Sequence, residues 1–260
     1  MNILELANFN LETVLFTFFR TSGLFLIAPM FSQKGIPHHV KIMFALTLSM
    51  VLSPIVQQQG FIVPLHLVDV LSLAAREMLV GVLIGFVFYS LFVGVQMAGA
   101  FVGFQAGFAI VNVIDPTTSQ QVSILAQFKF IIAMLIFLML DGHHMMLRAL
   151  ASSYQLIPLG EAMFRFSVTE DIARLVTGIF ILAIKLAAPV MATLVLTDVG
   201  LGVISRTVPQ MNIFIVGFPI KIALCLFFTG TALPIFGYVF SKALRVVDQE
   251  SLTLLTHLAR

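Results

Sequence analysis

The sequence predicts an all-α, membrane-associated protein, and two observations lead to that fold class. Hydrophobic residues make up 60% of the 260 residues, charged residues only 10%, and the mean hydropathy is +1.07. The apolar residues gather in six long runs with almost no charge inside them, at about 11–31, 40–57, 67–95, 122–140, 172–198 and 213–240. Most of these runs approach or exceed the ~20 residues that carry a helix across a hydrocarbon core of ~30 Å. The stretch 96–114 is apolar as well, so the third run continues into either a second pass or one long bent helix.

Composition excludes several classes of protein. A net charge of +2 gives no basis for nucleic-acid binding through phosphate neutralisation. The longest polar interval, about 141–171, is too short to build a soluble domain. The single Cys225 excludes a disulfide framework and reads as a buried small hydrophobe. No Lys or Arg precedes the first apolar run, so we expect Met1 to begin the mature protein. The Lys and Arg residues of the loops favour cytoplasmic termini.

Glycines recur at four-residue spacing along the third run and its continuation. Gly81 and Gly85 form one GxxxG pattern, and Gly99, Gly103 and Gly107 form a longer ladder. This spacing places each set on one helical face, where a neighbouring backbone can approach closely. The face predicts either ordinary helix packing within the chain or a surface that meets other subunits or lines a passage.

The glycine ladder ends in a break of unusual composition, GFAIVNVIDPTTSQQVS, at about 107–123. Asp115 stands before Pro116, which favours a turn because proline moves the preceding residue out of the helical region. The strip AIVNVI is too apolar for water and too short to span a bilayer, and the polar residues that follow Pro116 are uncharged. The break is therefore either a connecting loop or a re-entrant segment inside a protein-lined cavity.

Seven ionisable residues stand out by their position within or at the edges of apolar runs: Arg20, Arg76, Glu77, Lys129, Lys185, Asp198 and Lys221. A charge near the bilayer centre costs a few kcal/mol, so we expect these side chains to reach water, protein or each other. Asp198 and Lys221 are close to run ends, where snorkelling or a structural ion pair is the simple interpretation. The set has too few acids and histidines for a proton relay.

Neither a catalytic nor a metal site is predicted. His143 and His144 are adjacent, and adjacent helical side chains point about 100° apart and rarely share one metal ion. The chain has no nucleophile–base arrangement and no phosphate-binding loop, so we expect a non-enzymatic protein without cofactors.

Four stretches of this chain resemble the FliR family of flagellar export-gate subunits, which is similar to the T-type inner-membrane component of type III secretion systems. They are LFTFFRTSGLFLIAPMFSQKGIP, REMLVGVLIGFVF, QMAGAFVGFQAGFAIVNVIDPTTSQQ and RTVPQMNIFIVGFPIK. The resemblance covers essentially the whole chain, 1–260, as a single export-gate domain. The DPTTSQQ turn and the VPQMNIFIVGFP segment are its most specific parts.

The resemblance implies a non-enzymatic channel component that assembles with FliP and FliQ, contacts FlhB, and passes unfolded flagellar proteins across the bacterial inner membrane at the flagellar basal body. About 1–170 would resemble FliP, and about 171–260 would form a FliQ-like hairpin and tail. The family's pore-occluding loop corresponds to about 105–121, with Gln105, Phe108, Ile110, Val111, Asn112, Val113, Ile114, Asp115, Pro116, Thr117 and Thr118. The hairpin tip would comprise Pro209, Gln210, Met211, Asn212 and Phe214. Family assemblies are also lifted largely out of the lipid plane, and their subunits bury apolar faces against one another.

Two other classes of function compete with this reading. A secondary transporter for small solutes or protons would use helices broken near Pro189 and Pro219. It would act as a single polypeptide and would show two related halves, which the sequence lacks. A scaffold whose glycine faces hold other subunits, and which conducts nothing, is the other alternative.

Overall fold

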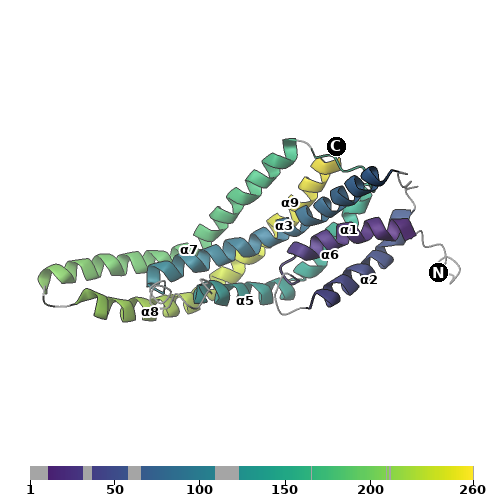
Figure 1. The fold of residues 1–260 in the computed structure, drawn as a ribbon. Coiled ribbons are helices and arrows are strands. Elements are labelled where there is room, and N and C mark those ends of the chain that lie inside the picture. The colour runs from purple at the N-terminus through teal and green to yellow at the C-terminus, as the bar shows by residue number, and fades with distance from the viewer. Residues whose placement is uncertain are drawn as a thin grey trace. The chain divides into compact units, whose positions relative to one another are not determined.

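The computed structural model describes residues 11–31, 37–57, 66–108, 123–164, 166–208, 210 and 212–259, and every regular element in these ranges is an α-helix (Figure 1). Eight helices follow one another: α1 (Leu11–Ile27), α2 (His38–Gln57), α3 (Leu67–Ala106), α5 (Ile124–Met139), α6 (Gly142–Leu156), α7 (Phe166–Thr207), α8 (Ile213–Thr231) and α9 (Leu233–Ala259). The predicted all-α class is confirmed. The predicted count of about six long helices is wrong for the described residues.

The count differs because hydropathy does not register every helix break. The third run is one uninterrupted helix of 40 residues, α3, rather than two passes. The polar interval 141–171 contains a helix of its own, α6. The last run is divided at Ala232, and Pro234 is the second residue of α9. A proline there costs no hydrogen bond, because the first N–H groups of a helix have no partner within it.

Two described helices are long and apolar enough to cross a membrane by themselves. They are α3 and α7, each with a window of mean hydropathy 2.4. The consecutive pairs α5–α6 and α8–α9 pass the same test only if each pair is taken as one span, which gives up to four spans. Pro189 and Pro219 lie inside α7 and α8, which continue through them.

The chain forms two compact units, and α3, α7 and α9 each contribute to both. The first unit comprises 1–90, 141–175 and 245–260, and the second comprises 91–140 and 176–244. Aromatic rings fill the centre of the second unit: Phe92 lies 5.3 Å from Phe137, 5.5 Å from Phe130 and 6.0 Å from Phe240 between ring centroids. Large buried side chains such as Phe16, which is 1% exposed, fill the first unit.

Glycines set the distance between α1 and α3 in the first unit. A Cβ atom added to Gly81 would overlap the carbonyl of Arg20, and one added to Gly23 would overlap the carbonyl of Met78. Gly85 meets the carbonyl of Leu24 in the same way, at 2.9 Å from the position a Cβ would take. The two backbones therefore lie in contact, as small residues permit.

The end of α9 is held within the first unit by a buried carboxylate. Asp171 is 2% exposed, and His257 Nδ1 lies 2.6 Å from its Oδ2. Arg174 Nη2 lies 3.1 Å from the other carboxylate oxygen. The backbone N–H of Met163 donates to the carbonyl of Leu258 at 2.9 Å. Side-chain and backbone contacts together fix the C-terminal turn.

Candidate functional site

The predicted pore loop, 105–121, lies only partly within the described residues. Gln105 is in the last turn of α3, and Phe108 follows that helix. The other predicted loop positions lie outside the described residues: Ile110, Val111, Asn112, Val113, Ile114, Asp115, Pro116, Thr117 and Thr118. The structure describes the residues on either side of the loop, the end of α3 at 103–108 and the start of α5 at 123–126, which together are called the loop base.

A glycine cap ends α3 where the loop leaves it. Gly107 has φ +94°, a conformation that residues with a Cβ rarely adopt. The Phe108 N–H donates to the Gly103 carbonyl at 3.0 Å, and the Gly107 N–H donates to the Phe104 carbonyl at 3.1 Å. This pair of bonds is the Schellman motif, which satisfies the last carbonyls of a helix. A Cβ at Gly107 would also stand 2.7 Å from the Phe218 ring of α8.

The first residues described after the predicted loop pack against the last turns of α3. A Cβ atom added to Gly103 would overlap the hydroxyl of Ser123, the residue just before α5. One added to Gly99 would overlap the Cα atom of Ala126 in the first turn of α5. The glycine ladder thus packs α5 against α3 within the second unit. Phe108 and Ser123, the described residues on either side of 109–122, therefore both lie beside the last turns of α3.

An ion pair ties the base of the loop to the C-terminal helices. Gln105 Nε2 donates to Asp198 Oδ2 of α7 at 2.7 Å. Lys221 Nζ of α8 lies 2.8 Å from Asp198 Oδ1 and 3.1 Å from Oδ2. Hydrogen bonds to ionised groups are the stronger kind, so this carboxylate connects α3, α7 and α8. A structural ion pair was one of the two explanations that the sequence offered for Asp198 and Lys221. Nothing in the sequence predicted that Gln105 would join them.

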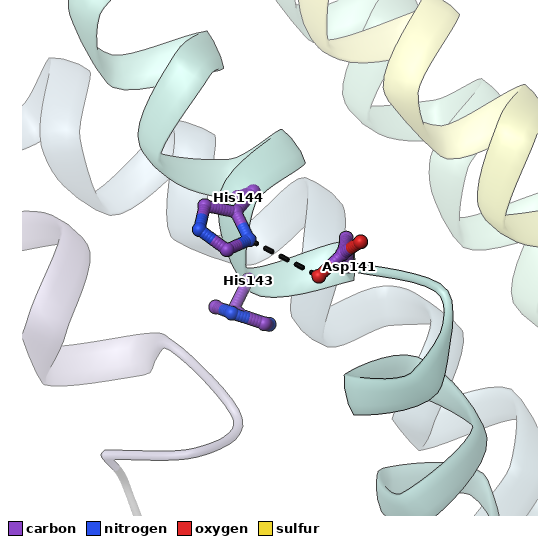
Figure 2. Close-up of side chains that lie close together, drawn as sticks. All are labelled: Asp141, His143 and His144. Atoms are coloured by element: carbon purple, nitrogen blue, oxygen red, sulfur yellow. Dashed lines mark hydrogen bonds and ion pairs between the residues drawn. The ribbon is translucent and has the colours of Figure 1, made fainter.

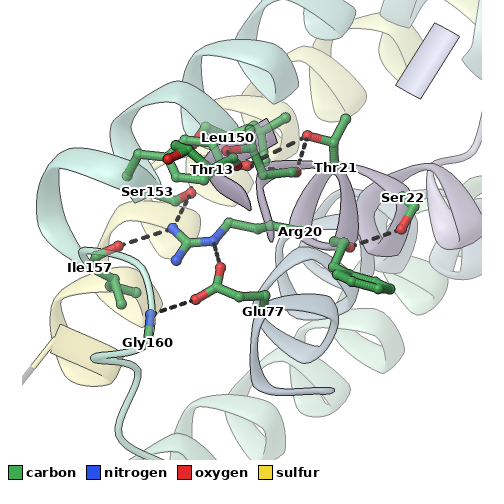
Figure 3. Close-up of polar contacts among 12 residues, drawn as sticks. Thr13, Arg20, Thr21, Ser22, Glu77, Leu150, Ser153, Ile157 and Gly160 are labelled. Carbon is green, nitrogen blue, oxygen red and sulfur yellow. Dashed lines mark hydrogen bonds and ion pairs between the residues drawn. The ribbon is translucent and has the colours of Figure 1, made fainter. Parts of the chain in front are cut away.

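A second charge cluster is fully buried in the first unit, where Arg20 of α1 meets Glu77 of α3 (Figure 3). Arg20 Nε donates to Glu77 Oε2 at 2.6 Å, and both side chains are 0% exposed. The other carboxylate oxygen, Oε1, accepts the backbone N–H of Gly160 at 2.9 Å. The carboxylate of Glu77, an acid deep inside the third apolar run, is therefore held at both of its oxygens.

The guanidinium of Arg20 also binds the end of α6. Its Nη1 donates to Ser153 Oγ and to the Ile157 carbonyl, each at 3.1 Å (Figure 3). Its carbon Cζ stands 4.4 Å from the centre of the Tyr154 ring, within the range of a cation–π contact. This arrangement joins α1, α3 and α6 and has the character of a structural core.

The predicted hairpin tip is described only in part. Asn212 caps α8: its side-chain Oδ1 accepts the Ile215 N–H at 3.4 Å. Gln210 lies in the turn before it, and Phe214 lies in the first turn of α8. Pro209 and Met211 lie outside the described residues.

The residues around His143 come closer together than the sequence led us to expect. The donor atoms of Asp141, His143 and His144 all lie within 4.8 Å of one another (Figure 2). His144 Nδ1 lies 3.2 Å from Asp141 Oδ1, so a carboxylate does join the histidine pair. Asp141 and His144 are exposed, and an acid paired with the third residue after it is common where a helix begins. These three residues are the ones that could hold a metal ion in the described part of the chain.

The remaining charges of the apolar runs are placed differently. Arg76 is exposed, although its neighbour Glu77 is buried. Lys129 of α5 is 4% exposed, and Lys185 of α7 is exposed. No ion pair or hydrogen bond joins the ammonium of either lysine to another described residue.

Comparison with known proteins gives the family of this chain. The model of the bacterial export proteins, family 1, matches residues 11–246. The chain is 38% identical over 213 residues to the flagellar biosynthetic protein FliR of Bacillus subtilis, a match that covers 80% of this chain and 81% of that protein. It is 30% identical to the FliR protein of Pectobacterium carotovorum, over 84% and 83% of the two chains, and 26% identical to that of Escherichia coli, over 83% and 82%. The resemblance noted in the sequence is confirmed: the chain belongs to family 1 of the bacterial export proteins, and within it to the FliR family of flagellar biosynthetic proteins.

Proposed function

We propose that this protein is a channel subunit of the flagellar export gate in the bacterial inner membrane. It assembles with FliP and FliQ subunits, contacts FlhB, and lets unfolded flagellar proteins leave the cytoplasm, while its loop at 105–121 closes the passage at rest. The proposal rests on family membership and, above all, on the built base of the loop. There the Gly107 cap and the hydrogen bond from Gln105 to Asp198 fix the exit of the segment, and the contact of Gly103 with Ser123 fixes its return.

The chemistry of the loop supports a seal for a polypeptide channel. Its apolar strip can exclude water, and a hydrophobic constriction resists ions by dewetting. The tip beyond Pro116 carries only neutral hydrogen-bonding side chains and so would not retain a passing chain by charge. A channel that passes polypeptides of varied sequence requires an uncharged surface that binds no particular side chain strongly.

The exposed surface of the helices supports assembly with other subunits. Large apolar side chains are open along most helices, among them Phe227, Phe104 and Leu196 at 64%, 76% and 72% exposure. Apolar surface on this scale must be covered by lipid or by protein. A subunit of a larger gate has both.

Two measurements on the co-expressed gate test the proposal. Native mass spectrometry of the gently extracted particle should find this chain together with FliP- and FliQ-like subunits. Deletion of 110–118 should then raise the ion conductance of that particle in planar bilayers while the particle stays intact. Unchanged conductance would remove the plug assignment. A monomer that transports small solutes in liposomes would instead favour the secondary transporter.

A further inference from the structure

The second compact unit has an imbalance of charge in a strongly apolar setting. The ranges 91–140 and 176–244 contain five basic residues (Lys129, Lys185, Arg206, Lys221 and Lys242) and two acidic ones, Asp115 and Asp198. Asp198 already binds Lys221 and Gln105. Apart from Asp115 in the loop, the unit therefore has no carboxylate left for its other basic residues.

The lack of a carboxylate partner is most consequential for Lys129 and Lys185, because these two basic residues line the same pocket. The pocket is also lined by Thr229, whose side chain carries a hydroxyl, and its remaining walls are apolar, including Pro189, Val190 and Phe236. Lys129 is 4% exposed and has no anionic partner among the described residues. A buried ammonium without a counter-charge is unfavourable, which is why buried charges in proteins are normally paired.

Lys185 stands in the middle of an uncovered face of α7. Residues spaced three or four apart along a helix share one face, and here these residues are all exposed: Gly178, Ile181, Lys185, Ala188, Ala192, Leu196, Val199 and Val203. Gly178 has nothing within 4 Å of the position a Cβ would take. The face is apolar, contains three small residues, and carries a single charge.

This face fits a helix better than it fits a lipid headgroup. At a membrane interface the residues on one side of Lys185 would be apolar and those on the other side polar, but here they are apolar in both directions along α7. Small residues at four-residue spacing let a second helix approach closely. The cavity of about 20 Å³ has room for the end of one side chain and not for a phosphate with its glycerol.

We propose that this face of α7, together with the Lys129–Lys185 pocket, receives an apolar helix of a second polypeptide that carries one Asp or Glu near its middle. The carboxylate of that residue would stand between the two ammonium groups and accept hydrogen bonds from both. The interface would stay dry except for this one ion pair, which would fix the register of the two helices. The proposal extends the proposed function by a partner of stated chemistry, and it holds whether or not the loop closes a pore.

A zero-length cross-link tests the ion pair directly. An apolar carbodiimide added to the co-expressed, membrane-embedded particle joins a lysine amine to a carboxylate that touches it, and peptide mass spectrometry identifies both residues. Lys221 and Asp198 lie 2.8 Å apart and give an internal positive control. We expect an amide between Lys129 or Lys185 and one Asp or Glu inside an apolar helix of another subunit. An amide to Asp115 of the same chain, or none at all while the Lys221–Asp198 amide forms, overturns the proposal.

Charge variants separate the protein partner from a lipid. Lys185→Gln and Lys129→Gln together should reduce the fraction of chain recovered in the intact particle about tenfold, the effect of losing a charged hydrogen bond. Lys185→Arg, which keeps the charge, should restore most of it, and Lys242→Gln, which changes an exposed lysine of the same unit, should have no effect. Intact assembly of the double Gln variant, with loss of a bound anionic phospholipid in native mass spectra, would assign the pocket to lipid and refute the helix.

Discussion

Removing the buried carboxylate of Glu77 should destabilise the first unit strongly, and the structure allows the size of the effect to be worked out. Glu77 and Arg20 are 2.6 Å apart at 0% exposure, so neither charge has water to replace its partner. Loss of one member of a buried ion pair costs about 3–5 kcal/mol, because the other charge stays buried and uncompensated. Arg20 keeps its bonds to Ser153 and Ile157, so we expect Glu77→Gln to fall near the lower end, at about 3 kcal/mol.

Two further variants make the reasoning quantitative. Glu77→Ala also leaves the Gly160 N–H without an acceptor, which adds about 1–3 kcal/mol. Replacing both partners, by Arg20→Met with Glu77→Met, removes the uncompensated charge. The double variant should therefore be more stable than Glu77→Ala, and its loss should be smaller than the sum of the two single losses.

The assay is thermal unfolding in detergent, followed by a dye that fluoresces on reaction with thiols. Cys225→Ala removes the natural thiol, and Ala149→Cys places a new one in α6, at a position that is 3% exposed. The dye then reports the unfolding of the first unit. A loss of about 3 kcal/mol should lower the midpoint by roughly 6–12 °C. Arg76→Gln is the matched control, since Arg76 is the exposed neighbour on the same helix. An unchanged midpoint for Glu77→Gln, or a double variant weaker than Glu77→Ala, would refute the argument.

Three further outcomes follow from individual contacts. Asp198→Asn weakens two charge-assisted bonds at the loop base, so the ion conductance of the assembled gate in planar bilayers should rise about tenfold or more without loss of assembly. An unchanged conductance would show that Asp198 does not hold the loop base in place. Gly103→Ala should destabilise the second unit by about 1–3 kcal/mol, measured with the thiol dye at the natural Cys225, which is buried in that unit, whereas Gly230→Ala, with open space around it, should be neutral or slightly stabilising; equal effects would refute the packing role. Asp171→Asn should speed tryptic cleavage of α9 severalfold, and exposed Glu170→Gln should not; equal rates for both would show that the carboxylate does not hold the helix end.

Hydropathy located the helices well but placed their breaks poorly. The apolar runs at 11–31 and 40–57 correspond closely to α1 and α2, because a change from apolar to polar sequence coincides with the helix ends there. At Ala232 the chain breaks between two helices while the sequence remains apolar, so a hydropathy average continues across it. The helix α6 was missed for the opposite reason, since its exposed face carries polar residues such as His144 and Arg148.

The loop base illustrates which part of a site a sequence can reveal. The Gly107–Phe108 pair, a glycine followed by an apolar residue after a long helical run, is the pattern of a Schellman cap and could have been identified. The contact between Gln105 and Asp198 could not, because 93 residues separate them and nothing local distinguishes that glutamine from others. Contacts between distant polar residues depend on the packing of whole helices, and a single sequence does not specify that packing.

The charges of the apolar runs divide into two classes that should behave differently. Arg20 with Glu77, and Lys221 with Asp198, are neutralised inside the chain, so their loss should harm the isolated protein. Lys129 and Lys185 have no anionic partner among the described residues, and removing them relieves the isolated chain of an unfavourable charge. A Gln variant of Lys129 should therefore raise the thermal midpoint of the chain alone while it weakens the assembled particle. Such a reversal of sign is what distinguishes a residue kept for a partner from one kept for the fold.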